Sequence, residues 1–306
     1  MSYARLCKKP LLFRSFTGLT ISEFDAIYGE IESKYEEHEK GRYRSNIKRV
    51  RDIGAGRPYK LKVRERFVML LVYYRLYITY TLSGFLFDLD QSNVCRDITM
   101  LEPLIKRCIP LPKKLYKRSR RLRTMDEVEE ESFPGFKAFI DSTEQEIPRP
   151  KNKIKMKSYY SGKKKKHTVK TQYMVNTKGL ILHKTEHRKG RKHDYDIYKH
   201  NHPVTPPQVE NIFDLGYFGV QKDFTTVKSV LPIRKRRNNM FSYEETTYNK
   251  KHSRLRIIVE HTICRLKKFG IMGTRFRNRL RKYNHASDIV SGLLNFRIIQ
   301  FNRMSL

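Results

Sequence analysis

The sequence predicts an α/β protein in which a mixed sheet flanked by helices follows an all-helical region. Residues 57–109 carry apolar side chains at helical spacing, whereas residues 136–233 contain five short strand-like runs and one short helical segment. Two longer helical patterns follow, at about 244–269 and 287–301. Strands that alternate with helices are typical of a sheet covered by helices.

The composition of the 306-residue chain points to a polyanionic partner. Apolar residues make up 39%, enough for a folded core, and 65 Lys and Arg against 31 Asp and Glu give a net charge of +34 and a pI near 10.1. A nucleic acid is the usual partner for such an excess, and the chain shows no lipidation motif or basic amphipathic anchor for a membrane surface. We expect no signal peptide and no membrane span, and the four cysteines form no CxxC pair, so a reducing, cytoplasmic location is predicted.

The first half of the chain is predicted to be helical. Thr20 and Glu23 form a capping box for a helix that continues to about Glu39. A second apolar pattern begins after Pro58, and TLSGFLFDLDQSNVCRDITMLEPLI (81–105) fits two short helices broken near 88–91, with Ser92 as the N-cap of the second.

Helix, short turn and helix form the layout of a helix-turn-helix. Its second helix would place Ser92, Asn93 and Arg96 near a DNA groove. A three-helix bundle without DNA contact has the same pattern. Residues 110–134, which run from PLPKK through a basic and then an acidic stretch to Pro134-Gly135, are interpreted as a linker.

The second half is predicted to contain five strands. FKAFID (136–141) is followed by runs at 167–177 and 179–187 joined by a tight turn, a short helix at about 194–199, and runs at 209–214 and 226–233. Two of these runs, FKAFID and VENIFD, end in an aspartate, at Asp141 and Asp214. If the two strands are neighbours, both carboxylates emerge at one edge of the sheet.

Two adjacent carboxylates repel each other and favour a divalent cation as compensation. Oxygen ligands suit magnesium, with manganese as a substitute, and two such ions can cut a phosphodiester. A third acid is expected from Glu260, in the middle of the predicted helix SRLRIIVEHTICRLKKF, with Arg256 and Lys267 on the same face to hold DNA phosphates. Taken singly, a strand-end Asp is more often a turn residue, and a Glu four residues after an Arg is more often a surface ion pair.

These motifs resemble the DDE transposases of prokaryotic insertion sequences, a broad group that includes the Harbinger-like elements. FIDSTE, YYSGKKKKHTVKTQ, KHDYDIYK, FDLGYFG and RIIVEHTICRLKKF carry the resemblance. Ser253 stands where such families often have a Tyr, three residues before Arg256. The resemblance implies an RNase H-like catalytic core, a metal-binding triad of Asp141, Asp214 and Glu260 with two Mg²⁺ ions per site, and recognition of transposon ends by the helix-turn-helix.

The resemblance also implies an activity and partners. The expected reaction is metal-dependent hydrolysis at the transposon end followed by attack of the freed 3′-hydroxyl on target DNA. Double-stranded DNA, comprising terminal inverted repeats and target, is the expected partner, in a homodimer or higher assembly located with the nucleoid. A DNA-binding relative without catalysis, and a nuclease without strand transfer, are the alternatives.

Residues 149–192 hold 16 Lys and Arg and one acid, Glu186, interleaved with Tyr159 and Tyr160. A solvated loop is the plain interpretation, and a groove for the DNA backbone is favoured over it. The DNA contacts expected in this segment are Lys163, Lys164, Lys165, Lys166 and His167.

Two other possibilities concern Asp194 and the histidines. Asp194, in a family motif with His193, is the main competitor of Asp214 as second acid. Six histidines lie between positions 167 and 202, but His183 and His187 fall in a predicted strand, where their spacing does not suit zinc, so DNA contact or surface exposure is favoured.

These features divide the chain into four predicted segments. They are an N-terminal helical segment (1–52), a helix-turn-helix domain (53–110), a linker (111–134) and an RNase H-like catalytic domain (135–306).

Overall fold

The computed structural model describes residues 1–43, 58–121, 124–235 and 240–304 and divides them into two compact units. The first unit comprises residues 1–110 together with 269–271, and the second comprises 111–268 and 272–306. The predicted boundary between residues 52 and 53 lies outside the described residues.

The first unit is all-helical. Its helices are α1 (Tyr3–Cys7), α2 (Pro10–Thr17), α3 (Ile21–Tyr43), α4 (Val63–Leu76), α5 (Tyr80–Phe87) and α6 (Gln91–Cys108). The predicted capping box of α3 is present, since Thr20 N–H donates to Glu23 and Glu23 N–H donates to the Thr20 hydroxyl. A core of aromatic rings joins Phe13, Phe24 and Phe67: Phe13 meets Phe24 edge-on, and Phe24 stacks on Phe67.

A tight turn separates α5 from α6, as the sequence predicts. Asp88 takes the left-handed conformation that ends α5, and a Cβ on Gly84 would lie 2.4 Å from the Leu89 carbonyl oxygen, so the turn requires a glycine there. The predicted N-cap of α6 is wrong by two residues. Asp90, not Ser92, is the cap, because its carboxylate accepts the Ser92 N–H while Ser92 already lies in the first turn.

The segment 111–134, expected to be a linker, contains short helices and belongs to the second unit. They are α7 (Pro112–Ser119), α8 (Met125–Glu127), a π-helical turn η1 (Val128–Ser132) and a 3-10 turn η2 (Pro134–Phe136). Val128 and Phe133 are buried in the hydrophobic core of that unit, and Leu115 and Tyr116 pack against it. Burial of these apolar side chains holds the segment against the core, which its charged composition does not indicate.

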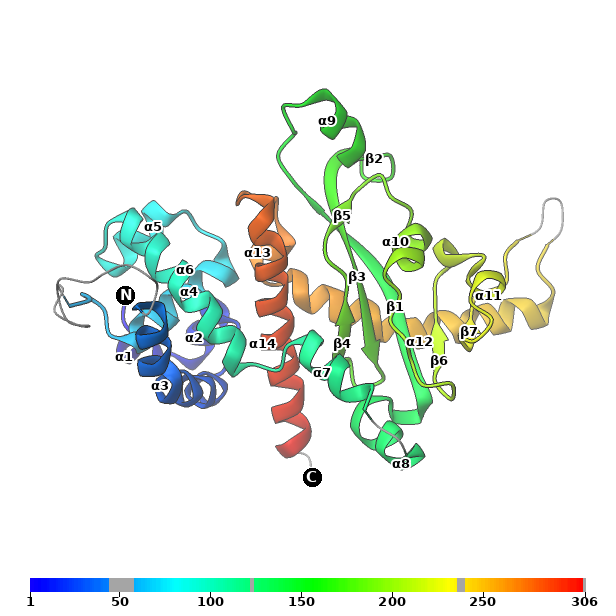
Figure 1. The fold of residues 1–306 in the computed structure, drawn as a ribbon, viewed down its shortest axis with the longest axis horizontal. Coiled ribbons are helices and arrows are strands. Elements are labelled where there is room, and N and C mark those ends of the chain that lie inside the picture. The colour runs from blue at the N-terminus through cyan, green and yellow to red at the C-terminus, as the bar shows by residue number, and fades with distance from the viewer. Residues whose placement is uncertain (44–57, 122–123, 236–239, 305–306) are drawn as a thin grey trace. The chain divides into compact units, whose positions relative to one another are not determined.

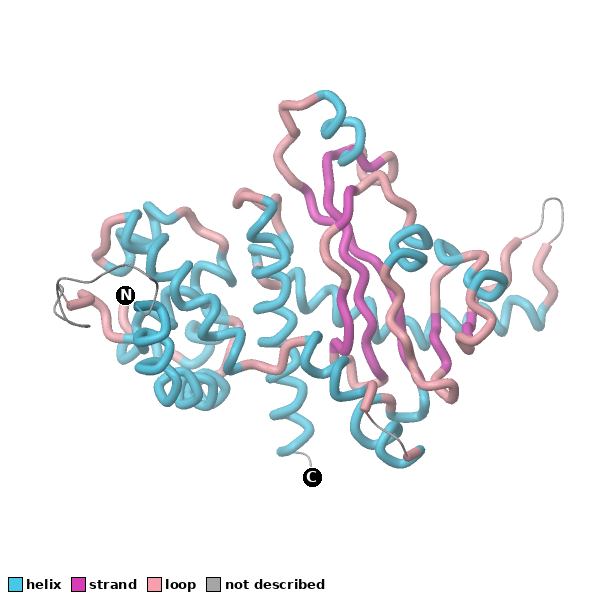
Figure 2. Tube along the Cα trace, in the orientation of Figure 1, coloured by secondary structure: helices cyan, strands magenta, loops and turns pink. Residues whose placement is uncertain are grey.

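The second unit is built around a mixed sheet flanked by helices (Figures 1 and 2). Its strands are β1 (Lys137–Glu146), β2 (Tyr160–Ser161), β3 (Lys166–Asn176), β4 (Ile181–Lys184), β5 (Arg188–Lys189), β6 (Glu210–Ile212) and β7 (Ser229–Val230). The helices of this part of the chain are α9 (Lys153–Tyr159), α10 (Asp194–His200), α11 (Val220–Asp223), α12 (Tyr243–Lys267), α13 (Gly270–Gly273) and α14 (Tyr283–Met304), with 3-10 turns η3 (Leu215–Tyr217) and η4 (Leu280–Lys282).

The strand order confirms the RNase H-like sheet that the family resemblance implies. β1 pairs antiparallel with β3, β3 antiparallel with β4, and β1 and β6 lie parallel, as do β6 and β7. The predicted tight turn between β3 and β4 is present: Gly179 has φ +78° and donates its N–H to Asn176. The last helix starts earlier than predicted, at Tyr283.

β1 is longer than the sequence predicts, and Asp141 lies within it instead of at its end. Pairing with β3 continues from Ala138–Asn176 to Glu146–Thr168, so the polar run STEQE stays in the ladder. Pairing with β6, however, stops at Phe139–Ile212. Asp141 therefore lies two residues beyond the end of the β1–β6 ladder.

The two faces of the sheet are covered by different helices. Alternation along β1 directs Ile140, Ser142 and Glu144 to the face of α10, and Asp141 to the face of α12. Figure 1 shows α12 crossing the sheet, and both α12 and α14 pack on this second face. Asp141 therefore faces the long helix that carries Arg256 and Glu260.

Candidate active site

Asp141 and Asp214 come together, as the two strand-end patterns predict. Phe139 and Ile212 are the last pair of the parallel β1–β6 ladder. Asp141 follows Phe139 by two residues and Asp214 follows Ile212 by two residues, so both aspartates lie at the same end of the sheet. Both carboxylates face one guanidinium: Arg256 Nη2 lies 3.3 Å from Asp141 Oδ2, and Arg256 Nη1 lies 3.2 Å from Asp214 Oδ1. We call this the Asp141–Arg256–Asp214 cluster.

The environment of Asp141 opposes its ionisation. Desolvation raises the pKa of this carboxyl to about 6, and the nearby charges of Asp214 and Asp194 add to the increase. The Arg256 charge and the Ser142 N–H, which donates to Asp141 Oδ1 at 2.8 Å, offset part of it. A carboxylate that is buried among other acids despite its cost is typical of a functional site.

Arg256 lies between two carboxylates in the structure, and its predicted contact with a DNA phosphate stays a prediction. The sequence suggests that Arg256 holds a DNA phosphate, but only 12% of its side chain is exposed and both of its terminal nitrogens face aspartates. One positive charge between two carboxylates leaves a net negative site.

Glu260 is not joined to the two aspartates in the structure. It is exposed on α12, four residues after Arg256 and hence about 6 Å further along the same helix face. Within the described ranges, no three His, Cys, Asp or Glu side chains lie close enough together to form a complete metal site. The predicted role of Glu260 therefore stays a prediction.

The residues of the cluster nevertheless fit a divalent cation. Asp141 and Asp214 supply the hard oxygen ligands that magnesium and manganese prefer. Desolvation, with a smaller addition from the charge of Asp214, raises the pKa of Asp141, and a cation of charge +2 offsets this cost of ionisation better than one guanidinium does.

A buried tyrosine, missed in the sequence, ties the loop of Asp214 to β1. Tyr217 is fully buried three residues after Asp214, and its hydroxyl lies 2.9 Å from the Ser142 hydroxyl and 2.8 Å from Gln172 Nε2, which donates to it. Ser142 adjoins Asp141. The signal was present in FDLGYFG, but nothing local indicates what the tyrosine contacts.

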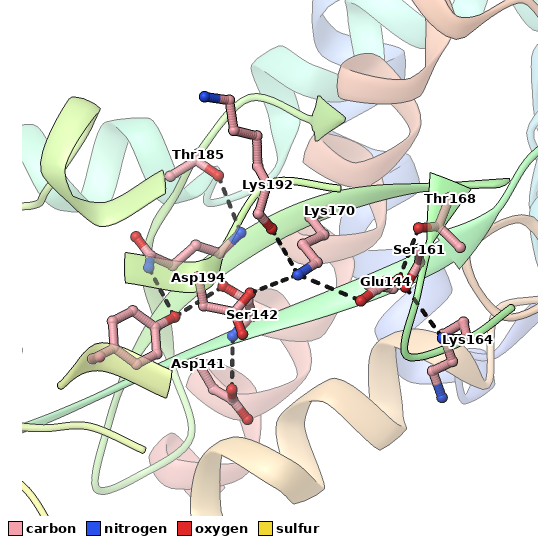
Figure 3. Close-up of polar contacts among 12 residues, drawn as sticks. Asp141, Ser142, Glu144, Ser161, Lys164, Thr168, Lys170, Thr185, Lys192 and Asp194 are labelled. Carbon is pink, nitrogen blue, oxygen red and sulfur yellow. Dashed lines mark hydrogen bonds and ion pairs between the residues drawn. The ribbon is translucent and has the colours of Figure 1, made fainter. Parts of the chain in front are cut away.

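Asp194, the competitor of Asp214, lies on the other face of the sheet. It pairs with Lys170 at 3.2 Å, and Lys170 also lies 3.5 Å from Glu144, the next acid on the α10 face (Figure 3). Asp214 shares Arg256 with Asp141, whereas Asp194 does not, and this geometry favours Asp214 as the partner of Asp141.

The expected DNA contacts of the second unit lie at and beyond the turn between β2 and β3. Lys163, Lys164 and Lys165 are exposed in that turn, Lys166 pairs with Glu146 at 2.6 Å, and His167 packs edge-on against Tyr160. Partial desolvation and the charge of Lys164 lower the pKa of Lys267, which also feels the charges of Asp141 and Glu144. Lys267 is thus within electrostatic reach of both Lys164 and Asp141.

In the first unit, Ser92, Asn93 and Arg96 are exposed in the first turns of α6. Arg96 Nη1 donates to Asn93 Oδ1 at 3.1 Å. This is the position that recognition residues occupy in a helix-turn-helix.

The histidines do not gather into a metal site within the described residues. Burial lowers the pKa of His183 to about 4, and its ring packs against Tyr116. His187 contacts the Asn284 side chain at 3.0 Å.

Comparison with known families agrees with this architecture. Residues 140–295, more than half of the chain, match the family described as DDE superfamily endonuclease. Residues 59–111 match the helix-turn-helix of DDE superfamily endonuclease. The chain therefore belongs to the DDE transposases of insertion sequences.

One curated transposase is similar to this chain over most of the length of both proteins. The probable transposase for insertion sequence element IS702 of Microchaete diplosiphon is 33% identical over 247 residues, which cover 79% of this chain and 83% of that protein. No solved structure matches the chain significantly. Among the described helices, none is both long and apolar enough to cross a membrane.

Proposed function

We propose that this protein binds the ends of an insertion sequence, cleaves the DNA there and joins the freed end to a target, using Asp141, Asp214 and Glu260 to hold two Mg²⁺ ions. The observation that carries this proposal is the sharing of Arg256 by Asp141 and Asp214 at the edge of an RNase H-like sheet. The family match supports the reaction class, and the net charge of +34 supports a DNA substrate.

The chemistry proceeds in two steps, hydrolysis of one phosphodiester and then transesterification of another. In the first, a water oxygen bonds to phosphorus at the element's end and the phosphorus–O3′ bond breaks, leaving a 3′-hydroxyl on the element and a 5′-phosphate on the flanking DNA. In the second, that 3′-hydroxyl bonds to a target phosphorus and displaces a target 3′-oxygen, which takes up the proton. Divalent ions, when bound, supply the Lewis acidity that activates the attacking oxygen and neutralises charge on the leaving oxygen.

The chain's own residues prepare the site for these steps. Asp141 and Asp214 present carboxyl oxygens, and Tyr217 holds the Asp214 loop on β1 through Ser142. Glu260 would complete the set from α12. Arg256 compensates the two aspartates, while Lys267 and the Lys163–Lys166 turn offer positive charge for phosphates.

The test is cleavage and strand joining of DNA that carries the element's own termini, with Mg²⁺ or Mn²⁺. Asp141→Asn, Asp214→Asn and Glu260→Gln are each expected to reduce both products by at least about 100-fold while DNA binding persists. Glu244→Gln, which removes an exposed acid from the first turn of the same α12, is the matched control and should leave activity unchanged.

The outcomes separate the alternatives. Cleavage without joined product would favour a nuclease, and salt-sensitive binding without cleavage by the wild type would favour a DNA-binding relative. Full activity of Glu260→Gln would remove Glu260 from the site. Light scattering of the protein with end DNA would test the proposed homodimer.

A further inference from the structure

A cavity of about 930 Å³ opens on the α10 face of the second unit, the side of the sheet opposite to Asp141. Residues of β1, β2, β3, α9 and the segment 190–194 line it. Its size falls within the range of cavities that hold small organic ligands. Neither hydrolysis nor strand joining at Asp141 and Asp214 uses this space.

The rim of the cavity is positively charged. The side chains of Lys157, Lys163, Arg191 and Lys192 line it and are exposed, and none of them forms an ion pair with an acid in the described part of the chain. Unpaired cations around an opening attract phosphate groups.

The floor has the opposite sign. Glu144 and Asp194 flank the single charge of Lys170, whose Nζ also donates to the Lys192 carbonyl oxygen at 2.8 Å (Figure 3). Two carboxylates and one ammonium give this group a net charge of −1. The side chain of Glu144 is only 9% exposed and accepts the Thr168 hydroxyl at 2.7 Å, so its position is well defined.

This reversal of sign argues against a simple phosphate site. A cavity that binds only phosphate has no use for a buried carboxylate at its floor, because that carboxylate would repel the ligand. A nucleotide fits both signs, since its phosphates are anionic and its base edges carry N–H donors that carboxylates accept.

An aromatic ring completes the lining. Tyr160 is 41% exposed, lines the cavity and lies 5.6 Å from the His167 ring, which meets it edge-on and supports it. The Met156 side chain adds an adaptable apolar contact on the α9 side. An exposed ring of this kind is a surface on which an unpaired base can stack.

We propose that this cavity binds unpaired nucleotides of a DNA strand, with their bases against Tyr160 and above Glu144 and their phosphates on the basic rim. Glu144 follows Asp141 by three residues in β1, so it lies about 10 Å further along the strand and, because side chains alternate, on the other face of the sheet from Asp141. This inference rests on the proposed function for its DNA substrate, and it assigns to the cavity a DNA strand that is separated from its complement.

The test compares three DNA duplexes of the same paired length in buffer with EDTA, so that no chemistry takes place. One duplex is blunt, one has a three-nucleotide 5′ single-stranded extension, and one has a three-nucleotide 3′ extension. Fluorescence anisotropy should show that the wild type binds one of the extended duplexes on the order of 10-fold more tightly than the blunt one. Tyr160→Leu should reduce this preference to about 2-fold or less, whereas Tyr160→Phe, which keeps the ring, should retain it.

The control is Ile154→Ala. Ile154 is 80% exposed on the same α9 but does not line the cavity, so the preference should be unchanged. Equal binding of blunt and extended duplexes by the wild type, or full preference in Tyr160→Leu, would overturn the inference and leave the proposed function intact. Absence of binding to all three duplexes would instead count against DNA binding altogether. Competition by free deoxyadenosine monophosphate at micromolar concentration would also overturn it, because the cavity would then bind a free nucleotide.

Discussion

Replacement of Asp141 by Asn is expected to stabilise the metal-free protein at neutral pH. The pKa of this carboxyl rises from 3.8 to about 6 in the folded state, chiefly through desolvation. A shift of about two units corresponds to roughly 3 kcal/mol, since each unit is worth about 1.4 kcal/mol. That free energy is the cost of holding Asp141 ionised, and an amide of the same shape does not incur it.

The sign of the pH dependence follows from the raised pKa. Below the ordinary pKa of 3.8, Asp141 is protonated in both states and no cost exists. As the pH rises from 3.8 to about 6, the unfolded chain ionises first, so the free energy of unfolding falls. Above about 6 the full cost is present, and the variant's advantage should be largest there.

Thermal unfolding followed by circular dichroism, with EDTA present, measures this difference. At pH 7.5 the Asp141→Asn protein should melt several degrees higher than the wild type, at about 2 °C or more per kcal/mol, and at pH 4 the two should melt alike. Replacing EDTA by Mn²⁺ should stabilise the wild type more than the variant, because only the wild type offers an anionic ligand at this position. Asp126→Asn, at an exposed position of α8, is the control and should show no such pH-dependent gain.

A lower melting temperature for Asp141→Asn at pH 7.5 would refute the reasoning, because it would mean that the pairing with Arg256 outweighs desolvation. An equal gain at both pH values would also refute it, since the benefit would then not arise from ionisation.

Three further predictions concern other parts of the chain. Tyr217→Phe removes the hydroxyl that joins Ser142 and Gln172, and should lower stability by about 1–2 kcal/mol and reduce DNA cleavage more than DNA binding, as measured by melting, anisotropy and a cleavage assay. Arg66→Met removes the fully buried guanidinium that lies 3.0 Å from Asp97, and should destabilise the first unit by about 3–5 kcal/mol, measured by urea unfolding. Arg96→Ala should weaken binding to the element's ends about 5- to 150-fold, as measured by anisotropy, and should change the melting temperature little.

Each of these changes has a matched control. Tyr248→Phe removes a hydroxyl from a partly exposed tyrosine and should change stability by less than Tyr217→Phe. Lys60→Ala breaks an exposed ion pair with Asp88 and should cost less than about 1 kcal/mol. Arg14→Ala removes the same charge from α2, and a loss of end binding as large as that of Arg96→Ala would argue against a specific contact by α6.

Much of the fold could be predicted because it follows from local patterns. Alternation at 167–177 marked β3, the Asn176–Gly179 turn fixed the hairpin with β4, and the apolar stripe around Val259 and Ile263 marked the long helix α12. The N-cap of α6 was placed two residues late, because Asp90 and Ser92 are both good caps and only the backbone conformation distinguishes them.

The sequence by itself determined the order of the main strands β1, β3, β4, β6 and β7 and of the helices α10, α12 and α14, the excess of basic residues and the pair of aspartates at Asp141 and Asp214, since each depends on residue type and short-range periodicity. Tertiary structure decided the rest. Pairing with β3 extended β1 through a polar run, the sides of the sheet separated Asp194 from Asp141, and the packing of α12 set Arg256, instead of Glu260, against both aspartates. These outcomes depend on contacts between residues 22 to 115 positions apart, whose geometry no local pattern encodes.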